Sequence, residues 1–579
     1  MKIDTVFLSA LNAHQQGDIK SAQLGYKKIL RVKPLHFDAL HLLGVCYFND
    51  QKLQESKQHI KRALVVNNKF AEAHFNLGNT LLALGELIEA KQSYQKAIDL
   101  KTNYIDAYSN LGTVLRSLSE LEQAQQVYKK ALQIAPSVQL WYNYGNILAD
   151  QKLFDQAKVA FKNAIELDSE AFAAWDSLGS IYANQGRYDE ALPNYQKAIT
   201  LQPEFAEGHS NISGVFIELG KLDKGLNHAK KAFELNPDNI FALSNLGSAQ
   251  INNGLFDDAF LTLQKAYEIN PRFLKCNSAL GRLNCLLGQW DKAIENYGIS
   301  YKIDPENEGL EDGVYLAVLA YLLGDASNCQ RYLEITKSAK DGGLLIHKGA
   351  KAYWLFLNRL LQHFQDKNYI ARPARIHVIG ESHSLPYSGL EITFDDQIMQ
   401  CQSLWIPGCK QWHLGNTQPN QYKAAVINHF RSLPKSSTVL MAIGEIDCRP
   451  DEGIVKFMYN NPEMAIDAIV NETINNYLNW LVQANTEMQH QIIVSGVPAS
   501  NIDFNKLEFI SKLGFAELLS TFNEVLKSES QKRGFKFLDI FSMTNFGDGV
   551  SNGKWHIDEF HLSPAAGQEA FKNHLTFNP

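Results

Sequence analysis

The sequence lacks several signals that define large classes of protein. It has no uninterrupted apolar run of about 18 residues, so we expect no membrane-spanning helix. Its seven cysteines include no C-x-x-C pair and are odd in number, which favours reduced thiols over a disulfide framework. The first residues carry too short an apolar stretch for a secretory signal. Together these absences predict a cytoplasmic protein.

Strong positive charge and common ligand-binding motifs are missing too. The formal net charge is −7 at pH 7 and the pI is about 6.2, which argues against binding nucleic acid by neutralising its phosphates. The chain contains no H-E-x-x-H zinc motif and no phosphate-binding loop of the Walker type. We therefore expect no nucleic-acid partner, no metal and no cofactor.

A period of 34 residues runs through the first part of the chain. It is marked by prolines, by glycines, and by a small residue five positions after each glycine slot. The prolines are Pro34, Pro136, Pro203, Pro237, Pro271 and Pro305, the glycines Gly17, Gly85, Gly186, Gly220, Gly254 and Gly288, and the small residues Ala22, Ala90, Ala124, Ala157, Ala191 and Ala259. This period is typical of tetratricopeptide repeats (TPRs), each a pair of helices. It predicts an all-α solenoid of about nine to ten repeats over residues 1–339, the last a degenerate repeat containing Gly324.

Each marker has a physical role in such a repeat. Glycine permits a left-handed turn between the first helix (A) and the second (B), and alanine lets the two helices approach closely. We expect proline to begin the next helix, where its missing N–H costs nothing. Aromatic side chains at one phase of helix B should fill the gap between helices; they are Tyr94, Tyr128, Phe161 and Tyr195.

Asparagines recur at one phase of helix A, the helix that lines the concave surface of such repeats. They are Asn76, Asn110, Asn143, Asn211 and Asn245. Side-chain amides offer both a donor and an acceptor to the backbone of an extended peptide. The pattern resembles the repeat region of the O-linked N-acetylglucosamine transferases, which implies a protein or peptide partner in the groove. The alternative is that asparagine is simply common at this slot of the repeat.

The period ends near residue 339, and the sequence then changes character. Residues 340–373 read as a capping helix and a linker. From 374 to 579 short apolar runs alternate with helical segments near 464–485 and 506–533; the runs are Ile376–Ile379, Val439–Ile443, Ile492–Val494 and Phe535–Ile540. This alternation predicts a parallel sheet with helices on both faces, in which ligands bind at the carboxyl ends of the strands.

Two motifs in this second region supply the parts of an activated nucleophile. V-I-G-E-S-H-S places Ser382 in a tight turn after the first strand, and D-E-F-H near the C-terminus holds Asp558 and His561. A serine needs a base to become a nucleophile, and the base needs an orienting carboxylate. A third block, G-E-I-D-C-R, carries Asp447 and Arg449 after another strand.

In these motifs the chain resembles the SGNH (GDSL-type) hydrolases over about residues 374–579, which implies a flavodoxin-like α/β/α fold. The resemblance implies Ser382 as nucleophile, Asp558 as orienting acid and His561 as base. It implies an oxyanion hole built from Ser382 and Gly408, with Gly415 as the alternative glycine. The pocket residues implied by the same motifs are Glu381, His383, Glu445, Asp447 and His556.

One position departs from the family pattern. Ile446 stands where the family has an oxyanion-binding asparagine, and Arg449 is the nearest residue that can replace this donor. Loss of one such donor typically costs about 10²–10³ in rate. A subset of acetylesterases resembles this chain in carrying G-E-x-D at the same block.

The expected function is a TPR-scaffolded serine esterase or O-acyltransferase, acetyl transfer above all. Its expected substrate is an acylated carbohydrate or a glycan-bearing protein. Two alternatives stay open. One is a binding protein with an impaired SGNH-like domain, acting in protein glycosylation or surface-polysaccharide assembly. The other is a scaffold associated with a glycosyltransferase, although the C-terminal region of about 200 residues is short for such an enzyme.

Overall fold

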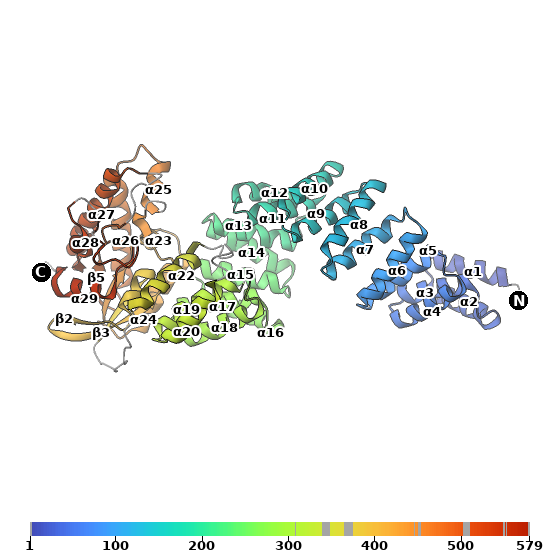
Figure 1. Cartoon of the computed structure of the whole chain (residues 1–579), viewed down its shortest axis with the longest axis horizontal. Helices are drawn as coiled ribbons and strands as arrows, with labels where there is room; N and C mark the ends of the chain where they lie inside the picture. Colours follow the sequence, from blue (N-terminus) through green and yellow to red (C-terminus); the bar gives the residue numbers. More distant parts are fainter. Residues whose placement is uncertain are drawn as a thin grey trace. The chain divides into compact units, whose positions relative to one another are not determined.

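The structure is a computed structural model, and it describes residues 3–306, 309–337, 348–363, 375–444, 446–449, 453–501, 510–547, 551 and 553–576. The chain divides into two units, Met1–Val215 and Phe216–Pro579. The division falls inside the helical repeats. The second unit therefore contains the later repeats together with the α/β region (Figure 1).

Helices α1 to α20 follow the 34-residue period that the sequence predicts, and α1 to α12 and α15 to α20 pack as consecutive pairs. Their bounds are α1 Ile3–Gln15, α2 Ile19–Val32, α3 Phe37–Asn49, α4 Leu53–Val66, α5 Ala71–Ala83, α6 Leu87–Leu100, α7 Ile105–Ser117, α8 Leu121–Ile134, α9 Val138–Asp150, α10 Phe154–Leu167, α11 Phe172–Asn184, α12 Tyr188–Leu201, α13 Ala206–Glu218, α14 Leu222–Leu235, α15 Ile240–Asn252, α16 Phe256–Ile269, α17 Leu274–Leu286, α18 Trp290–Ile303, α19 Leu310–Leu322 and α20 Ala326–Ile335.

The turn inside each pair has the predicted left-handed backbone. The six marker glycines named above have φ between 69° and 79°. Where the repeat lacks glycine, Gln51, Ser119 and Lys152 take the same conformation, with φ of 58°, 59° and 60°. The turn geometry is therefore imposed by the packing of the helix pair even where the residue does not favour it.

Close helix packing explains the other repeat markers. All six marker alanines are fully buried. The helix-B aromatic rings lie directly on helix-A glycines: a Cβ on Gly112 would lie 2.4 Å from the ring of Tyr128, and one on Gly145 would lie 2.6 Å from that of Phe161. The predicted filling of the interhelical gap by aromatic side chains is confirmed.

The predicted position of proline is wrong. Pro34 follows the end of α2 at Val32, and α3 begins only at Phe37. Pro237 likewise lies two residues after the last residue of α14. Proline therefore ends helix B instead of starting helix A, because its ring cannot continue the helix beyond the C-cap.

Helix α22 (Lys348–Leu360) follows the repeats and continues into the 3₁₀ turn η1 (Leu361–His363). The indole N–H of Trp354 donates to the carbonyl of Leu333 in α20, over 3.0 Å. Leu357 and Leu360 of α22 share one apolar cluster with the helix α19. The helix therefore packs onto the last repeat.

The α/β region contains a seven-stranded, mostly parallel sheet of order β2-β3-β1-β4-β5-β6-β7. The strands are β1 Arg375–Gly380, β2 Glu391–Phe394, β3 Gln397–Trp405, β4 Thr438–Ala442, β5 Gln491–Ser495, β6 Lys536–Leu538 and β7 Leu575–Thr576. Strand β1 pairs in parallel with β3 and β4, β4 with β5, and β5 with β6, which confirms the predicted parallel sheet.

The antiparallel edge strands were not expected from the sequence. β2 and β3 form a hairpin whose turn residues Asp395 and Asp396 have φ of 46° and 61°. Aspartates in a left-handed turn between alternating apolar residues are a recognisable hairpin signal. Strand β7 consists of only two residues, which is too short for a periodic pattern.

Helices cover both faces of the sheet. They are η2 Ser382–Tyr387, α23 Gln411–Gly415, α24 Gln421–Ser432, η3 Ile446–Cys448, α25 Gly453–Asn460, α26 Ile466–Ala484, α27 Lys512–Lys532, α28 Ile540–Thr544 and α29 Pro564–Asn573. Val439 and Met441 of β4 pack with α24, α26 and α27, whereas Leu440 and Ala442 pack with α28 and α29. Successive strand residues point to opposite faces, so one strand contributes to both layers.

Within the second unit, the repeats and the α/β region share a hydrophobic core. Leu283 and Leu286 of α17 lie in the same cluster as Val426 and Phe430 of α24. The amide of Asn428 also donates to the carbonyl of Leu287, over 3.3 Å. The later repeats are thus part of the body that carries the sheet.

Candidate active site

Ser382 lies at the carboxyl end of the central strand β1. Gly380, the last residue of that strand, pairs with Trp405 on one side and Ala442 on the other. A Cβ on Gly380 would lie 2.3 Å from the carbonyl oxygen of Ala442, so only glycine fits there. The chain then turns into η2, whose first residue is Ser382.

The structure brings the three residues of the predicted triad together. The Oγ of Ser382 lies 2.9 Å from Nε2 of His561, and Nδ1 of His561 lies 2.9 Å from Oδ2 of Asp558. Asp558 also accepts the backbone N–H groups of Phe560 and His561, over 2.9 and 2.8 Å. Because these backbone bonds form a local turn, the D-x-x-H spacing places the carboxylate of Asp558 against the ring of His561.

Burial and the Asp558–His561 pair set the charge states of the site. Burial alone would raise the pKa of Asp558, but the hydrogen bond and charge of His561 and the backbone donors hold it well below its usual range. Burial lowers the pKa of His561, against the opposing effect of Asp558. At neutral pH the carboxylate is ionised and the imidazole neutral, as a general base requires.

A second acid–histidine pair adjoins the first. Glu381 accepts hydrogen bonds from both the backbone N–H and the hydroxyl of Ser382, and its other oxygen lies 2.5 Å from Nδ1 of His383. The rings of His383 and His561 stack at 4.7 Å. Burial alone would raise the pKa of Glu381, but His383, Arg449 and His561 lower it to about 2.

The predicted oxyanion donors are engaged with protein groups. The N–H of Ser382 donates to Glu381, which caps the first turn of η2. The backbone of Gly408 hydrogen-bonds to Tyr353, and the guanidinium of Arg449 lies 5.0 Å from the ring of Phe560. Gly415, the alternative, packs against α26, where a Cβ would lie 2.9 Å from the backbone nitrogen of Tyr477.

The other predicted pocket residues have different surroundings. Asp447 is fully buried, and its carboxylate accepts the N–H groups of Gln411 and Trp412 at the start of α23. Nδ1 of His556 lies 2.9 Å from the hydroxyl of Ser551, and burial lowers the pKa of His556 to about 4. Glu445 lies outside the described residues.

Helix α22 covers the triad, a contact that the sequence reasoning missed. The ring of Phe356 stacks on the imidazole of His561 with centroids 3.9 Å apart, and Nη1 of Arg359 lies 3.8 Å from Asp558. The Tyr353 hydroxyl accepts a hydrogen bond from Nε1 of Trp405 at 3.1 Å. The run of aromatic residues in Y-W-L-F was a signal of a buried helix face, but its partner was not identifiable.

The covered site is nearly closed to solvent. Ser382 is 6% exposed, His561 5% and Phe356 1%. Phe356 of α22 covers one face of the His561 imidazole.

Four of the five asparagines of the predicted ladder are hydrogen-bonded to other side chains. Asn76 pairs with His41 at 3.0 Å, and Asn211 donates to Asp176 at 3.1 Å, each reaching the preceding repeat. Asn110 donates to Asn79 at 2.9 Å, Asn143 accepts from Gln139 at 2.8 Å, and Asn245 lies on α15. Part of the bonding capacity of Asn76, Asn110 and Asn211 thus links neighbouring repeats.

Membrane spans and metal clusters are both missing from the described residues. None of their helices is long and apolar enough to cross a membrane. The same residues contain no group of three or more His, Cys, Asp or Glu side chains suited to a metal ion.

The helical region matches known TPR proteins. Residues 66–280 match the family model of the Cilia and flagella-associated protein 70 C-terminal domain. The chain is a TPR repeat protein whose helical array is followed by a mixed α/β region. Comparison with curated proteins finds no match.

Several solved structures resemble the repeats. The crystal structure of MamA is 30% identical and covers 28% of this chain and 94% of its own, with a TM-score of 0.27. YrrB, described as a TPR protein with an unusual peptide-binding site, is 26% identical, covers 32% and 95%, and has a TM-score of 0.27. A TPR protein from Parabacteroides merdae is 18% identical, covers 42% and 97%, and has a TM-score of 0.36.

Proposed function

We propose that the α/β region is a serine-dependent acyl-transfer enzyme, an esterase or O-acyltransferase of the SGNH type. The observation that carries this proposal is the chain of contacts from Ser382 to His561 to Asp558, with both hydrogen-bond distances at 2.9 Å. A buried serine beside a neutral imidazole and an ionised carboxylate has the arrangement of an activated nucleophile.

The reaction would run in two steps. Ser382 Oγ attacks the ester carbonyl while its proton passes to Nε2 of His561, and the tetrahedral intermediate collapses as His561 returns the proton to the leaving alkoxide. Water or an acceptor hydroxyl then attacks the acyl-enzyme, loses its proton to His561 and releases the acyl group, restoring Ser382. Asp558 orients the imidazole and supports its positive charge throughout.

Two conformational changes would precede the first step. Helix α22 would leave the face of His561, on which Phe356 stacks, so that an ester can reach the buried serine. Glu381 must release both the N–H and the hydroxyl of Ser382. The hydroxyl has a single proton, which Nε2 of His561 must receive, and a carboxylate at the N–H would repel the developing oxyanion. Glu381 already contacts His383, which offers it a partner once the serine is released.

The proposed substrate is an acylated glycan, or a protein that bears one, brought to the site by the repeats. TPR solenoids present extended concave surfaces to peptides and proteins. The later repeats share a core with the catalytic region, so a partner bound to them would be held on the same body as Ser382.

A second function, a binding protein without catalysis, is favoured by one observation. The N–H of Ser382 is occupied by Glu381, and Ile446 cannot supply the missing side-chain donor. A fluorophosphonate probe separates the two functions. We expect it to label Ser382 in the wild-type chain and leave the Ser382→Ala variant unlabelled, as seen by peptide mapping. A folded wild type that does not react, together with a folded Phe356→Ala variant that does not react either, would refute the enzyme and support the binding protein.

A further inference from the structure

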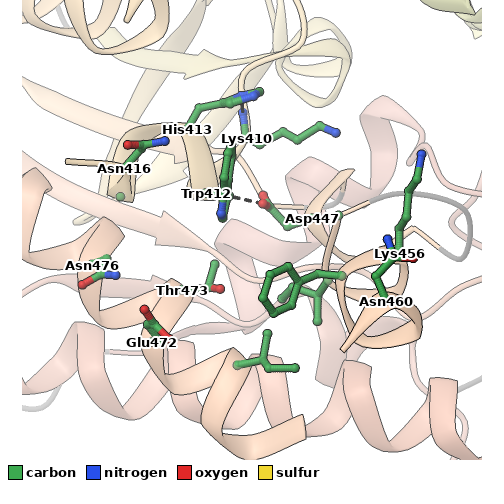
Figure 2. A pocket seen from close by; sticks show the side chains of 15 residues that line it. Lys410, Trp412, His413, Asn416, Asp447, Lys456, Asn460, Glu472, Thr473 and Asn476 are labelled. Carbon is green, nitrogen blue, oxygen red and sulfur yellow. Dashed lines mark hydrogen bonds between the residues drawn. The ribbon is translucent and has the colours of Figure 1, made fainter. Parts of the chain in front are cut away.

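A cavity of about 470 Å³ lies between α23, α25 and α26 (Figure 2). One wall comes from the segment that follows Gly408, and another includes Asp447, which precedes Arg449 by two residues. The cavity is therefore built on the two loops that carry the predicted oxyanion residues. Its volume is in the range of small-molecule sites.

The exposed indole of Trp412 forms a platform on one side of this cavity. Trp412 is 55% exposed, yet its backbone is held firmly, because its N–H and that of Gln411 donate to the buried carboxylate of Asp447 over 3.2 and 2.8 Å. The neighbouring His413 stacks on Tyr422 at 4.3 Å. A backbone that is fixed before binding reduces the entropy lost when a ligand packs on the side chain.

Polar side chains face the platform from α26. Figure 2 shows Thr473 and Glu472 across the cavity from Trp412, with Asn476 to one side. These three side chains form no hydrogen bond or ion pair with other residues in the described part of the chain. Lys456 and Asn460 of α25 line the opposite side and are likewise without such a partner there. The cavity thus holds a concentration of unused donors and acceptors beside one exposed aromatic face.

We propose that this cavity binds one sugar ring of a glycan. A pyranose has an apolar C–H face that suits an indole, and hydroxyl groups that need both donors and acceptors. Trp412 would stack on the ring, while Thr473, Glu472 and Asn476 would bond its hydroxyls. A fatty chain would leave these polar groups unpaired at a cost. The proposal rests on the proposed function for its role, which is to hold the glycan whose ester reaches Ser382.

Saturation-transfer NMR on the full chain tests the site, with methyl glycosides of glucose, galactose and N-acetylglucosamine as probes. We expect transfer to the ring protons of at least one glycoside in wild type, and a signal reduced about fivefold or more in Trp412→Ala, because the stacking surface is gone. Phe546→Ala is the matched control, since that side chain is 69% exposed and lies outside the cavity lining; it should bind as wild type does.

The absence of transfer to all three glycosides, or equal transfer in Trp412→Ala, would overturn the site. Asn476→Leu gives an independent test if Trp412→Ala does not fold: weakened transfer supports the site and unchanged transfer refutes it. Ser382→Ala should bind the glycosides normally. Sugar binding without fluorophosphonate labelling would keep this site and reject the enzyme, whereas labelling without sugar binding would do the reverse.

Discussion

Removal of the Phe356 ring should open the covered triad. This side chain is 1% exposed and stacks on His561 with centroids 3.9 Å apart, so it is a main contact between α22 and the predicted triad. The Trp354 hydrogen bond to Leu333 and the apolar contacts of Leu357 and Leu360 would still hold α22 to the last repeat. Phe356→Ala should therefore loosen the cover without removing the helix.

The size of the effect follows from the buried surface. Full burial of a phenylalanine side chain stabilises by about 1.5–3 kcal/mol. If about 2 kcal/mol of this holds α22 on the triad, its loss raises the open population about 30-fold, since each 1.4 kcal/mol is a factor of ten. The rate at which a probe reaches Ser382 should rise by a similar factor while the open state remains the minor one.

The assay is the pseudo-first-order rate of fluorophosphonate labelling at Ser382, with melting temperature as a check on folding. We expect labelling of Phe356→Ala to be at least about tenfold faster than that of wild type. Leu355→Ala is the matched control, because Leu355 is on the same helix and 38% exposed; its rate should not change. Unchanged labelling of Phe356→Ala would show that α22 does not limit access. Slower labelling by a folded variant would show that the ring is needed to position His561.

Three further predictions concern other parts of the chain. Asp558→Asn should slow labelling on the order of 10³–10⁴-fold, since the imidazole loses its orienting charge, and equal rates would reject the triad. Gly112→Ala should cost about 1–3 kcal/mol of stability, because its methyl group would clash with Tyr128 at 2.4 Å. Gly214→Ala, with nothing within 4 Å of the new methyl group, should gain about 0.5–1 kcal/mol. Thermal melting measures both changes, and equal effects of the two substitutions would reject the packing argument. Burial lowers the pKa of His429 to about 4, whereas the unfolded chain has its ordinary value near 6.5, so between pH 7 and 5 the unfolded state gains a proton here and the folded state does not. The free energy of unfolding should therefore fall as the pH falls, and in urea unfolding His429→Gln should lose about 1–2 kcal/mol less of it than wild type over this range. Equal losses in the two proteins would refute this.

The repeats were predictable because each marker acts locally. A left-handed turn, a close helix contact and a ring filling a gap recur every 34 residues, so the pattern is recognisable from all the repeats together although single repeats depart from it. The same locality explains the error at proline. From sequence alone, the position two residues after one helix resembles the position just before the next, and only the helix bounds separate Pro34 from the start of α3 at Phe37.

The α/β region was predictable in its parallel centre and less so at its edges. Buried central strands such as β4 are continuous apolar runs, whereas the β2–β3 hairpin mixes polar and apolar residues and β7 has two residues. The pairing of Asp558 with His561 follows from their spacing of three. The distance of His561 from Ser382, 179 residues earlier in the chain, follows only from the order of the strands.

The sequence by itself thus determined what depends on short spacing: the helical repeat, the alternation of strand and helix, and the D-x-x-H turn. Tertiary structure alone decided which surfaces meet. It set α22 on His561, turned Glu381 onto the N–H of Ser382, and joined the later repeats to the sheet through a common core. The first and the third of these contacts link residues far apart in the chain, and nothing in the sequence of an apolar helix face identifies the surface against which it will be buried.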